Sequence, residues 1–264
     1  MKLGFIGTGN MASAIMGGII KNQIIPANEI IGADVMEAGR KRVKEQFGIQ
    51  VTADNHEVVR NSDVVILSVK PQFYAEVIAE IKDVIREDQI IITIAPGKTL
   101  AWLKEQFGKN VKIVRTMPNT PALVGAGMTA ACPNEYMTKE EIAYVLTLLE
   151  SFGRVEIIPE RLMDTVVSVS GSSPAYVFMF IEAMADAAVS GGMPRAQAYQ
   201  FAAQAVLGSA KMVLETGKHP GELKDMVCSP AGTTIEAVRV LEEKGFRSSV
   251  IEAMKTCEEI SKNM

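Results

Sequence analysis

Between Lys2 and about Ile158, short runs of apolar and β-branched residues alternate with amphipathic segments at helical spacing. Runs such as Val64–Leu67 and Ile90–Ile92 are apolar at every position, which is typical of strands covered on both faces. Alternation of strands and helices implies right-handed crossover connections and a doubly wound parallel sheet. Ligands of such sheets bind beyond the carboxyl ends of the strands, so the fold class also predicts where a site lies.

The predicted elements of this first half alternate strictly along the chain. Strands are predicted at Lys2–Ile6, Glu29–Ala33, Asp63–Val69, Gln89–Ala95, Val111–Arg115 and Gly153–Ile158. Helices are predicted at Met11–Lys21, Ala38–Phe47, Tyr74–Ile85, Leu100–Phe107 and Lys139–Ser151.

After Pro159 the pattern changes, because apolar residues recur only at helical spacing. Glycines such as Gly217 and Gly245 follow helical segments, where a helix end favours a left-handed residue. We therefore predict an α/β Rossmann-type domain over residues 1–158 and an all-helical domain over residues 159–264. Helices are predicted at Leu162–Val169, Pro174–Val189, Arg195–Glu215, Gly221–Val227, Thr234–Glu243 and Ser248–Lys262.

The composition excludes several classes of protein. The chain has 264 residues, with 27 Lys and Arg against 31 Asp and Glu, whereas nucleic-acid binders usually carry a basic surplus. Three dispersed cysteines suit reduced thiols, and two histidines are too few for a His-rich metal site. The most apolar stretch, Val177–Met193, is interrupted by Glu182 and Asp186, so no membrane span is expected. We expect a soluble cytoplasmic protein that binds no metal, nucleic acid or membrane.

The turn after the first strand carries a specific motif. Residues Gly7–Ala12 read G-x-G-x-x-A between a predicted strand and a predicted helix. Gly7 permits a tight turn, Gly9 lets the backbone approach a pyrophosphate, and the N-terminus of the helix offers N–H groups to the phosphates. We therefore predict a dinucleotide cofactor. At this turn it would be held by Ile6, Gly7, Thr8, Gly9, Asn10 and Met11.

Asp34 ends the second predicted strand, where an acidic side chain accepts hydrogen bonds from the adenosine ribose. A carboxylate there also repels a 2′-phosphate, which slightly favours NADH over NADPH. The basic run Arg40–Arg42 could neutralise such a phosphate, so both cofactors remain open. An ordinary surface aspartate at a strand end is the alternative.

The ends of later strands supply the other walls of the predicted cofactor site. Small residues and prolines occur where the backbone would turn beside a ligand, although simple turns have the same composition. Asn55 is placed near the adenine end, and the proline-fixed loop Arg115–Pro121 suits the nicotinamide end. The further candidates are Asn55, Ser68, Val69, Lys70, Pro71, Ala95, Gly97, Pro118 and Asn119.

Two polar segments interrupt the apolar helical half. In Ser170–Pro174, Ser173 is placed to cap a helix, and in Ser229–Glu236, Thr233 and Glu236 fit a capping box. Each segment can be a helix cap and nothing more. As a site, the two helix N-termini would hold a carboxylate through backbone N–H groups, because neither segment contains Lys, Arg or His.

The stretches Phe178–Ala188 and Phe201–Met212 are rich in Ala, Met and Val on several faces. A helix that is apolar most of the way round must be buried, and about a hundred residues offer limited interior for several such helices. Packing against a second copy of the chain is therefore favoured over a tight bundle against the first domain.

Five motifs, in this order, resemble those of pyrroline-5-carboxylate reductases, and the similarity extends over the whole chain. They are Gly9–Met11, Ser68–Pro71, Met117–Pro121, Ser170–Tyr176 and the longest, Leu223–Val238. The resemblance implies a Rossmann domain joined to a helical dimerisation domain, with dimers assembled into higher oligomers such as a decamer. It also implies hydride transfer from NADH or NADPH to the imine carbon of 1-pyrroline-5-carboxylate, giving L-proline.

By the same resemblance, Thr234 is the catalytic residue and faces the imine nitrogen. A cyclic imine can be protonated before hydride attack, so Thr234 would orient the ring while proximity and alignment supply most of the rate. The chain departs from the family at Pro96, Ser173 and Asp34, where alanine, glycine and a serine or other polar residue are usual. The implied substrate-binding residues are Ser172, Ser173, Ser229, Ala231, Gly232, Thr233 and Thr234.

Three alternatives stay open. A 3-hydroxy-acid dehydrogenase would use a helix-borne lysine, for which Lys211 is the candidate, but no Asn pair follows it. A ketol-acid reductoisomerase would need a second acidic cluster besides Glu182 and Asp186. A protein that binds NAD(P) without turnover belongs to a different class.

Overall fold

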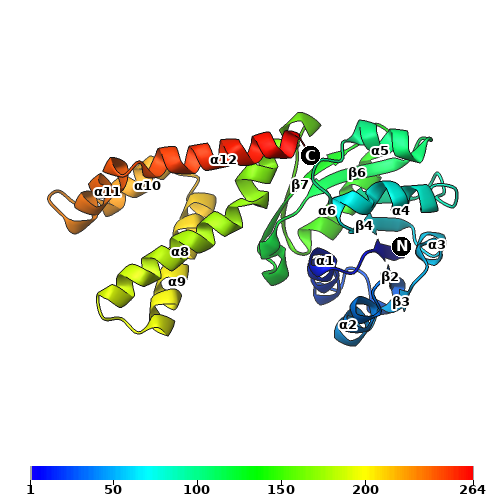
Figure 1. Cartoon of the computed structure of the whole chain (residues 1–264), viewed down its shortest axis with the longest axis horizontal. Coiled ribbons are helices and arrows are strands. Elements are labelled where there is room, and N and C mark those ends of the chain that lie inside the picture. The colour runs from blue at the N-terminus through cyan, green and yellow to red at the C-terminus, as the bar shows by residue number, and fades with distance from the viewer. Residues whose placement is uncertain (1, 264) are drawn as a thin grey trace. The chain divides into compact units, whose positions relative to one another are not determined.

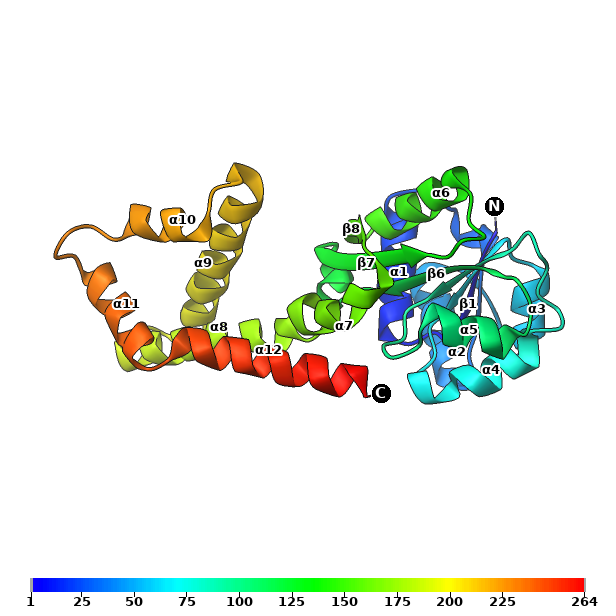
Figure 2. The same cartoon turned by 90° about the horizontal axis from the view of Figure 1, so that it is seen from above.

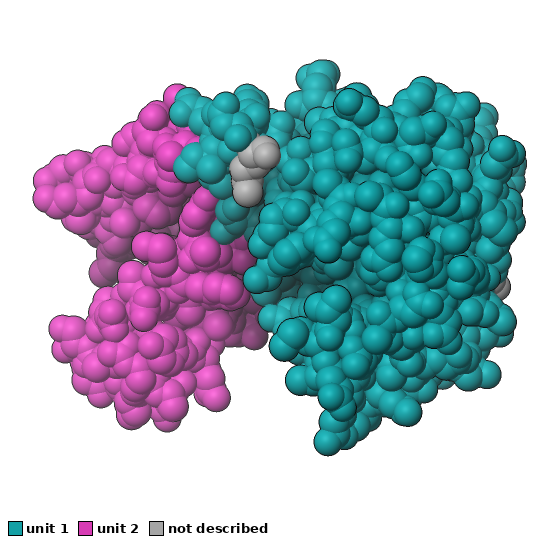
Figure 3. Space-filling model, turned by 45° about the vertical axis from the view of Figure 1, so that its right-hand side comes forward, with its two compact units in different colours: residues 1–172, 257–264 teal, residues 173–256 magenta. Residues whose placement is uncertain are grey.

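The computed structural model describes residues 2–263 and divides into two compact units, coloured separately in Figure 3. One unit comprises Met1–Ser172 together with Cys257–Met264, and the other comprises Ser173–Thr256. This division lies later in the chain than the expected domain boundary at 158/159. Residues 159–172 and the last turns of the final helix belong to the first unit.

An eight-stranded sheet forms the centre of the first unit, in the order β3-β2-β1-β4-β5-β6-β7-β8 (Figure 1). Neighbouring strands are parallel except for the antiparallel pair β6–β7. The predicted doubly wound α/β fold is confirmed, with this one antiparallel step. The strands are β1 (Leu3–Ile6), β2 (Ile30–Ala33), β3 (Gln50–Thr52), β4 (Val64–Leu67), β5 (Ile90–Thr93), β6 (Lys112–Met117), β7 (Gly127–Pro133) and β8 (Gly153–Ile157).

Two strands escape the sequence pattern. β3 has three residues, none of them fully buried. β7 reads Gly-Met-Thr-Ala-Ala-Cys-Pro, so small residues replace the β-branched run that marks the other strands. Its central positions are nevertheless buried, because β6 and β8 pair with it on both sides. Tertiary pairing, rather than intrinsic propensity, makes this segment a strand.

The residues of β1, β2, β4, β5 and β6 contribute alternately to two hydrophobic cores, one on each face of the sheet, whereas Ala130 and Cys132 of β7 join a smaller third cluster with Met163. In β1, Leu3 and Phe5 enter one core and Ile6 enters the other. The first core is closed by residues from α1, α2 and α6, and the second by residues from α3, α4 and α5; Figure 2 shows α1 and α6 on one side of the sheet and α4 and α5 on the other. Strands buried on both faces explain the unbroken apolar runs.

The helices of the first unit connect the strands. They are α1 (Asn10–Lys21), α2 (Glu37–Phe47), α3 (Asn55–Arg60), α4 (Tyr74–Ile81), α5 (Leu100–Phe107), α6 (Lys139–Glu150) and α7 (Met163–Val166). Short 3₁₀ turns occur at η1 (Ala27–Glu29), η2 (Pro71–Phe73), η3 (Thr120–Val124) and η4 (Glu160–Leu162), and a π-helical turn at η5 (Val167–Gly171).

The second unit is entirely helical and has almost no interior of its own. Its elements are α8 (Ser173–Ser190), α9 (Arg195–Thr216), α10 (Pro220–Val227), α11 (Thr233–Glu243) and the greater part of α12 (Phe246–Lys262). Within residues 173–256, the buried hydrophobic residues are Ala185, Ala198 and Ala202, whereas Phe178 and Phe201 are 60% and 68% exposed. Exposed apolar surfaces of this kind mark sites of interaction with a protein or a membrane.

One helical stretch, residues 160–190, is long and apolar enough to cross a membrane by length and composition. The expectation that no segment has this property is therefore wrong. That expectation was based on the apolar stretch that starts at Val177. The helical stretch begins earlier, at Glu160, and also contains the apolar residues of α7 and η5. Length and composition are weak evidence of a membrane span, because core helices of soluble proteins meet the same criterion.

Tyr74 joins the carboxyl ends of β4 and β5. Its side chain is fully buried. The Tyr74 hydroxyl donates to the Leu67 carbonyl oxygen, and the Tyr74 hydroxyl oxygen accepts the Ile94 N–H at 3.2 Å. Burial raises the pKa of the Tyr74 phenol far above its usual value, so the hydroxyl keeps its proton. A lone tyrosine at the start of a helix gives no sequence signal for this role.

We expect Tyr74→Phe to lower the free energy of unfolding by about 1–3 kcal/mol, because a buried carbonyl and a buried N–H lose their partner. Urea unfolding at a fixed protein concentration measures the change. Tyr144→Phe is the matched control, since the Tyr144 hydroxyl makes no hydrogen bond within residues 2–263. Equal effects of the two substitutions would contradict the role assigned to Tyr74.

Candidate functional site

The turn after β1 has the geometry that its glycines predict. Gly7 has a φ of +93°, and its N–H donates to the Ala33 carbonyl oxygen at 2.8 Å. A Cβ on Gly7 would lie 2.8 Å from the backbone carbonyl atoms of Ser68, so a larger residue does not fit. The Ser68 hydroxyl donates to the carbonyl oxygens of Ile6 and Gly7 at 3.1 and 2.7 Å. The ends of β1 and β4 are thereby held together.

The N-terminus of α1 is open to an anion. Gly9 is the N-cap residue, and in the described chain no side chain caps the helix and no acidic residue lies in its first turn, which begins Asn10-Met11. A Cβ at Gly9 would meet no atom within 4 Å. The first N–H groups of a helix have no partner within it, and here they lie beside open space at Gly9 and at the positive end of the helix dipole. These residues fit the pyrophosphate of a dinucleotide.

Asp34 lies at the end of β2 and faces Thr8 of the glycine turn. Its Oδ2 atom accepts hydrogen bonds from the Thr8 N–H and the Thr8 hydroxyl, both at 2.8 Å. Its Oδ1 atom accepts the Met36 N–H at 2.9 Å. Three donors therefore fix the Asp34 side chain at the place where the sequence predicts contact with the ribose.

The two arginines of the basic run Arg40–Arg42 hold backbone carbonyl groups around the same carboxylate. Arg40 Nη1 donates to the carbonyl oxygens of Asp34 and Val35, and Arg42 Nη2 donates to the carbonyl oxygen of Thr8. Both guanidinium groups thus bind the backbone of the predicted cofactor site. The sequence did not indicate this structural role for either arginine.

Asn55 is the first residue of α3, and its amide donates to Glu80 Oε2 at 2.8 Å. Around it, ligand atoms of Asp54, His56 and Glu80 lie within 4.8 Å of one another and could hold a metal ion. Asp54 Oδ1 already accepts the His56 N–H, and His56 Nε2 lies 2.9 Å from the Glu80 carbonyl oxygen. Hydrogen bonds within the group account for this arrangement without an ion.

The loops after β4 and β5 lie at the same edge of the sheet as the glycine turn, because these strands are parallel to β1. Gly97 has a φ of +73° directly after Pro96, as a type II turn requires. This local geometry explains how the loop accommodates a proline. The predicted cofactor residues in these two loops are Ser68, Val69, Lys70, Pro71, Ala95 and Gly97.

β6 runs further than predicted, through Met117, so the loop that suits the nicotinamide end starts only at the buried Pro118. Arg115, which the sequence placed at the junction of the predicted strand and that loop, is a strand residue; it is 4% exposed and its Nη1 lies 2.9 Å from Glu160 Oε1. Asn119 is buried, accepting the Met128 N–H and donating to the Ser170 carbonyl oxygen.

The first polar segment of the helical half leads directly into a helix. Ser173 is the first residue of α8, which follows directly after η5 and Ser172. That Ser173 caps this helix stays a prediction. The backbone at Ser172 is right-handed helical, with φ −95° and ψ −25°. Ser172 Oγ lies 3.3 Å from Cys257 Sγ.

The second polar segment forms a tight turn. The Gly232 N–H donates to the Ser229 carbonyl oxygen at 3.0 Å, and Ala231 has a φ of +56°, an unusual value for a residue with a side chain. A Cβ at Gly232 would lie 2.4 Å from Ser229 Oγ. A side chain at position 232 would therefore displace the Ser229 hydroxyl, and the strain at Ala231 is of the kind that clusters at functional sites.

The predicted capping box is wrong, because α11 begins one residue early. Gly232 is the N-cap residue, Thr233 and Thr234 are the first two helical residues, and no side chain in the described part of the chain caps this end. Glu236 instead bonds Arg239, with 3.0 Å between Oε2 and Nε. The uncapped first turn of α11 offers its N–H groups to an anion. Thr233 is exposed and Thr234 is half-buried.

The predicted site residues thus form two groups, each described within its own unit. The cofactor candidates and Ser172 belong to the first unit, where the strand ends bring most of them to one edge of the sheet. The turn Ser229–Gly232, with Thr233 and Thr234, belongs to the second unit.

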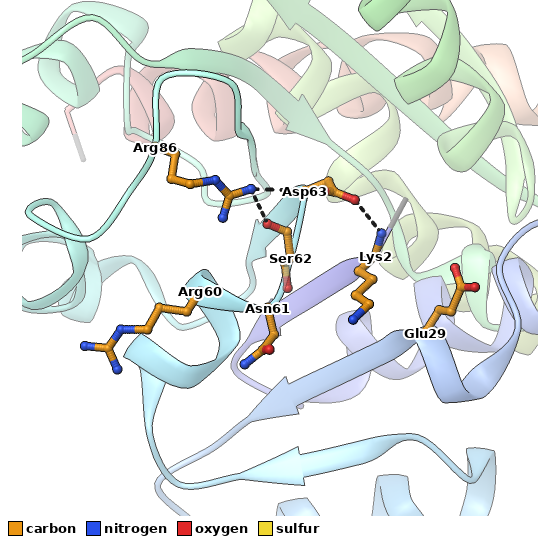
Figure 4. A pocket seen from close by; sticks show the side chains of 7 residues that line it. All are labelled: Lys2, Glu29, Arg60, Asn61, Ser62, Asp63 and Arg86. Carbon is orange, nitrogen blue, oxygen red and sulfur yellow. Dashed lines mark hydrogen bonds and ion pairs between the residues drawn. The ribbon is translucent and has the colours of Figure 1, made fainter.

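A polar cavity of about 550 Å³ lies at the amino-terminal ends of the strands, opposite the glycine turn (Figure 4). It is lined by residues around the amino ends of β1, β2 and β4, including Lys2, Glu29 and Asp63. Arg86 and the Lys2 N–H both approach the Asp63 carboxylate there, at 3.7 and 2.8 Å. Ligands of doubly wound sheets bind at the carboxyl edge, so this cavity is not the predicted site.

Comparison with known proteins matches both halves of the chain. Residues 160–264 match the family model of pyrroline-5-carboxylate reductase dimerisation, and residues 2–97 match that of NADP oxidoreductase, coenzyme F420-dependent. The pyrroline-5-carboxylate reductase of Escherichia coli (strain K12) is 55% identical over 267 residues, covering 100% of this chain and 98% of the relative.

Two solved structures are similar over the whole chain. A pyrroline-5-carboxylate reductase from Coxiella burnetii has a TM-score of 0.92 and 36% identity, covering 99% of this chain and 97% of that one. The Plasmodium falciparum pyrroline carboxylate reductase, solved with NADP bound, has a TM-score of 0.91 and 32% identity, covering 100% and 97%. This chain therefore belongs to the family of pyrroline-5-carboxylate reductases.

Proposed function

We propose that the chain reduces 1-pyrroline-5-carboxylate to L-proline with NADH or NADPH. The observation that carries the proposal is the glycine turn before α1, which in a member of this family leaves an uncapped helix N-terminus at the carboxyl edge of the sheet. Of the alternatives, a 3-hydroxy-acid dehydrogenase is disfavoured because the chain belongs to this family. Binding of NAD(P) without turnover is distinguished from catalysis by an assay of NADH oxidation.

The bound nicotinamide cofactor supplies a hydride. In this proposal the protein binds and orients the cofactor through contacts with its phosphates and with its adenosine ribose. The phosphates bind at the N-terminus of α1, and the ribose binds beside Asp34. The remaining predicted cofactor residues are Ile6, Gly7, Thr8, Asn55, Ser68, Val69, Lys70, Pro71, Ala95, Gly97, Pro118 and Asn119.

The substrate carboxylate is proposed to bind at the first turn of α11. Thr233 and Thr234 present backbone N–H groups there, directly after the strained Ala231 and the N-cap Gly232. A helix N-terminus stabilises an anion without a cationic side chain. The proposed contacts are Ser172, Ser173, Ser229, Ala231, Gly232, Thr233 and Thr234.

Thr234 is proposed to hydrogen-bond the ring nitrogen. A protonated imine is already electrophilic, so hydride addition at the imine carbon gives the amine without any new charge that must be stabilised. The absence of Lys, Arg and His from both proposed substrate segments fits this chemistry. Proximity and alignment then supply most of the rate acceleration.

The helical part, residues 159–264, is proposed to dimerise and to bind substrate as one functional domain. Its match to a dimerisation family and its exposed apolar side chains both support a homodimer, with higher oligomers such as a decamer built from dimers. A second copy, rather than lipid, would then cover the apolar face of α8, as expected for a cytoplasmic enzyme.

NADH is proposed as the preferred cofactor. The Asp34 carboxylate is fixed by Thr8 and the Met36 N–H, and Arg40 and Arg42 are bound to backbone carbonyl oxygens beside it. A 2′-phosphate at this position would lie against the Asp34 carboxylate, which repels it. A ribose hydroxyl can instead donate to that carboxylate.

The activity is tested by following NADH oxidation in the presence of 1-pyrroline-5-carboxylate. We expect steady turnover that depends on both reactants, with L-proline as product. Cofactor binding without oxidation would favour the non-catalytic alternative.

Thr234→Ala should lower kcat about 10–100-fold, because the substitution removes one orienting hydrogen bond and leaves the cofactor site intact. Thr234→Ser keeps the hydroxyl and is the control, with kcat near that of the wild type. A loss beyond about 10⁴-fold would show that Thr234 is an obligatory proton donor, contrary to this account.

Asp34→Ser should raise kcat/KM for NADPH at least about tenfold relative to NADH, since it removes the repelling carboxylate. Asp63→Ser, at the opposite edge of the sheet, is the control and should leave the ratio unchanged. The steady-state ratio for the two cofactors is the measurement. A wild-type preference for NADPH above tenfold would overturn the argument.

A further inference from the structure

Pro174 disturbs the hydrogen bonding of the helix that connects the two units. In an α-helix the N–H of residue 174 would bond to the carbonyl oxygen of Ser170, four residues earlier. Proline has no N–H, so this carbonyl oxygen loses its helical partner. A buried or half-buried carbonyl needs another donor.

The helix accommodates Pro174 by widening into a π-helical turn just before it. Residues Val167–Gly171 form a π-helical turn, and the Ser172 N–H donates to the Val167 carbonyl oxygen at 2.8 Å, a span of five residues. Single π turns inside α-helices are frequent at functional sites. This one directly precedes Ser172 and Ser173, two of the proposed substrate contacts.

Asn119 supplies the missing donor. Its Nδ2 atom lies 3.0 Å from the Ser170 carbonyl oxygen, and its Oδ1 atom accepts the Met128 N–H at 2.8 Å. The two partners fix which end of the amide is nitrogen, because one is an acceptor and the other a donor. Asn119 is only 8% exposed. The side chain therefore ties β7 to the π turn.

Further contacts hold the same turn. A Cβ on Gly171 would lie 2.9 Å from Met117 Cε, so the turn packs closely against the end of β6. Directly after the π turn, the Cys257 thiol donates to Ser172 Oγ at 3.3 Å. Because Ser172 Oγ accepts this bond, its own proton points away from Cys257. The turn is thus constrained by β6, by the loop at Asn119 and by the last part of α12.

We propose that Asn119 is a positioning residue for the substrate rather than a ligand of the cofactor. Pro174 frees the Ser170 carbonyl oxygen, and Asn119 captures it, so the pair sets the shape of the π turn that presents Ser172 and Ser173. This inference rests on the proposed function, and it reassigns a residue that the sequence placed in the cofactor site.

The test separates binding of the two reactants. Asn119→Ala should raise the KM for 1-pyrroline-5-carboxylate by about tenfold, the equivalent of one hydrogen bond of about 1.4 kcal/mol. The Kd for NADH, from fluorescence titration without substrate, should stay within about twofold. Asn134→Ala is the matched control, because Asn134 also accepts a backbone N–H, from Ile113, and donates to a backbone carbonyl, that of Val111. It should lose stability without changing that KM.

Pro174→Ala tests the same inference without removing a hydrogen-bonding group. The new N–H competes with Asn119 for the Ser170 carbonyl oxygen and favours ordinary α-helical spacing, so the KM for the imine should again rise. In the double variant Asn119→Ala/Pro174→Ala, the carbonyl regains a partner. Stability lost in Asn119→Ala should then recover while the KM stays high.

The outcomes are distinct from a failure of the proposed function, which would show as absence of turnover by the wild-type chain. With turnover established, a raised Kd for NADH and an unchanged KM for the imine in Asn119→Ala would make Asn119 a cofactor ligand. An unchanged imine KM in both single variants would also overturn the inference.

Discussion

The close approach of Gly7 to the backbone of Ser68 is the constraint on which the rest of the cofactor edge depends. Because a Cβ at Gly7 would collide with the end of β4, the chain turns at once and α1 begins at Asn10 with its N–H groups uncapped. Asp34 and Thr8 then fix the same turn from the side of β2. The anion site is thus a consequence of backbone packing rather than of charged side chains.

Both proposed anion sites use the same physical device. The first turns of α1 and α11 lack a side-chain cap among the described residues, and each is preceded by glycine as the N-cap residue. A helix end with open N–H groups holds an anion without the cost of desolvating a lysine or arginine. This explains how a chain with a net charge of −4 can be adapted to a dinucleotide and a small acid.

The sequence predicted the sheet and the glycine turn well, because unbroken apolar runs and a strand-turn-helix motif are local signals. It failed where the outcome depends on distant partners. β7 is a strand only because β6 and β8 flank it. The capping box at Thr233 failed because α11 begins one residue early, directly after the left-handed Ala231 and the N-cap Gly232. The bond from Asn119 to the Ser170 carbonyl oxygen likewise joins segments far apart in sequence.

A crystal structure with NADH and L-proline bound would test the central claim most directly. The account predicts the pyrophosphate at the N-terminus of α1 and the proline carboxylate at the first turn of α11, with the ring nitrogen within hydrogen-bond reach of Thr234. Proline bound away from Thr234, or a cofactor that leaves the glycine turn empty, would contradict it.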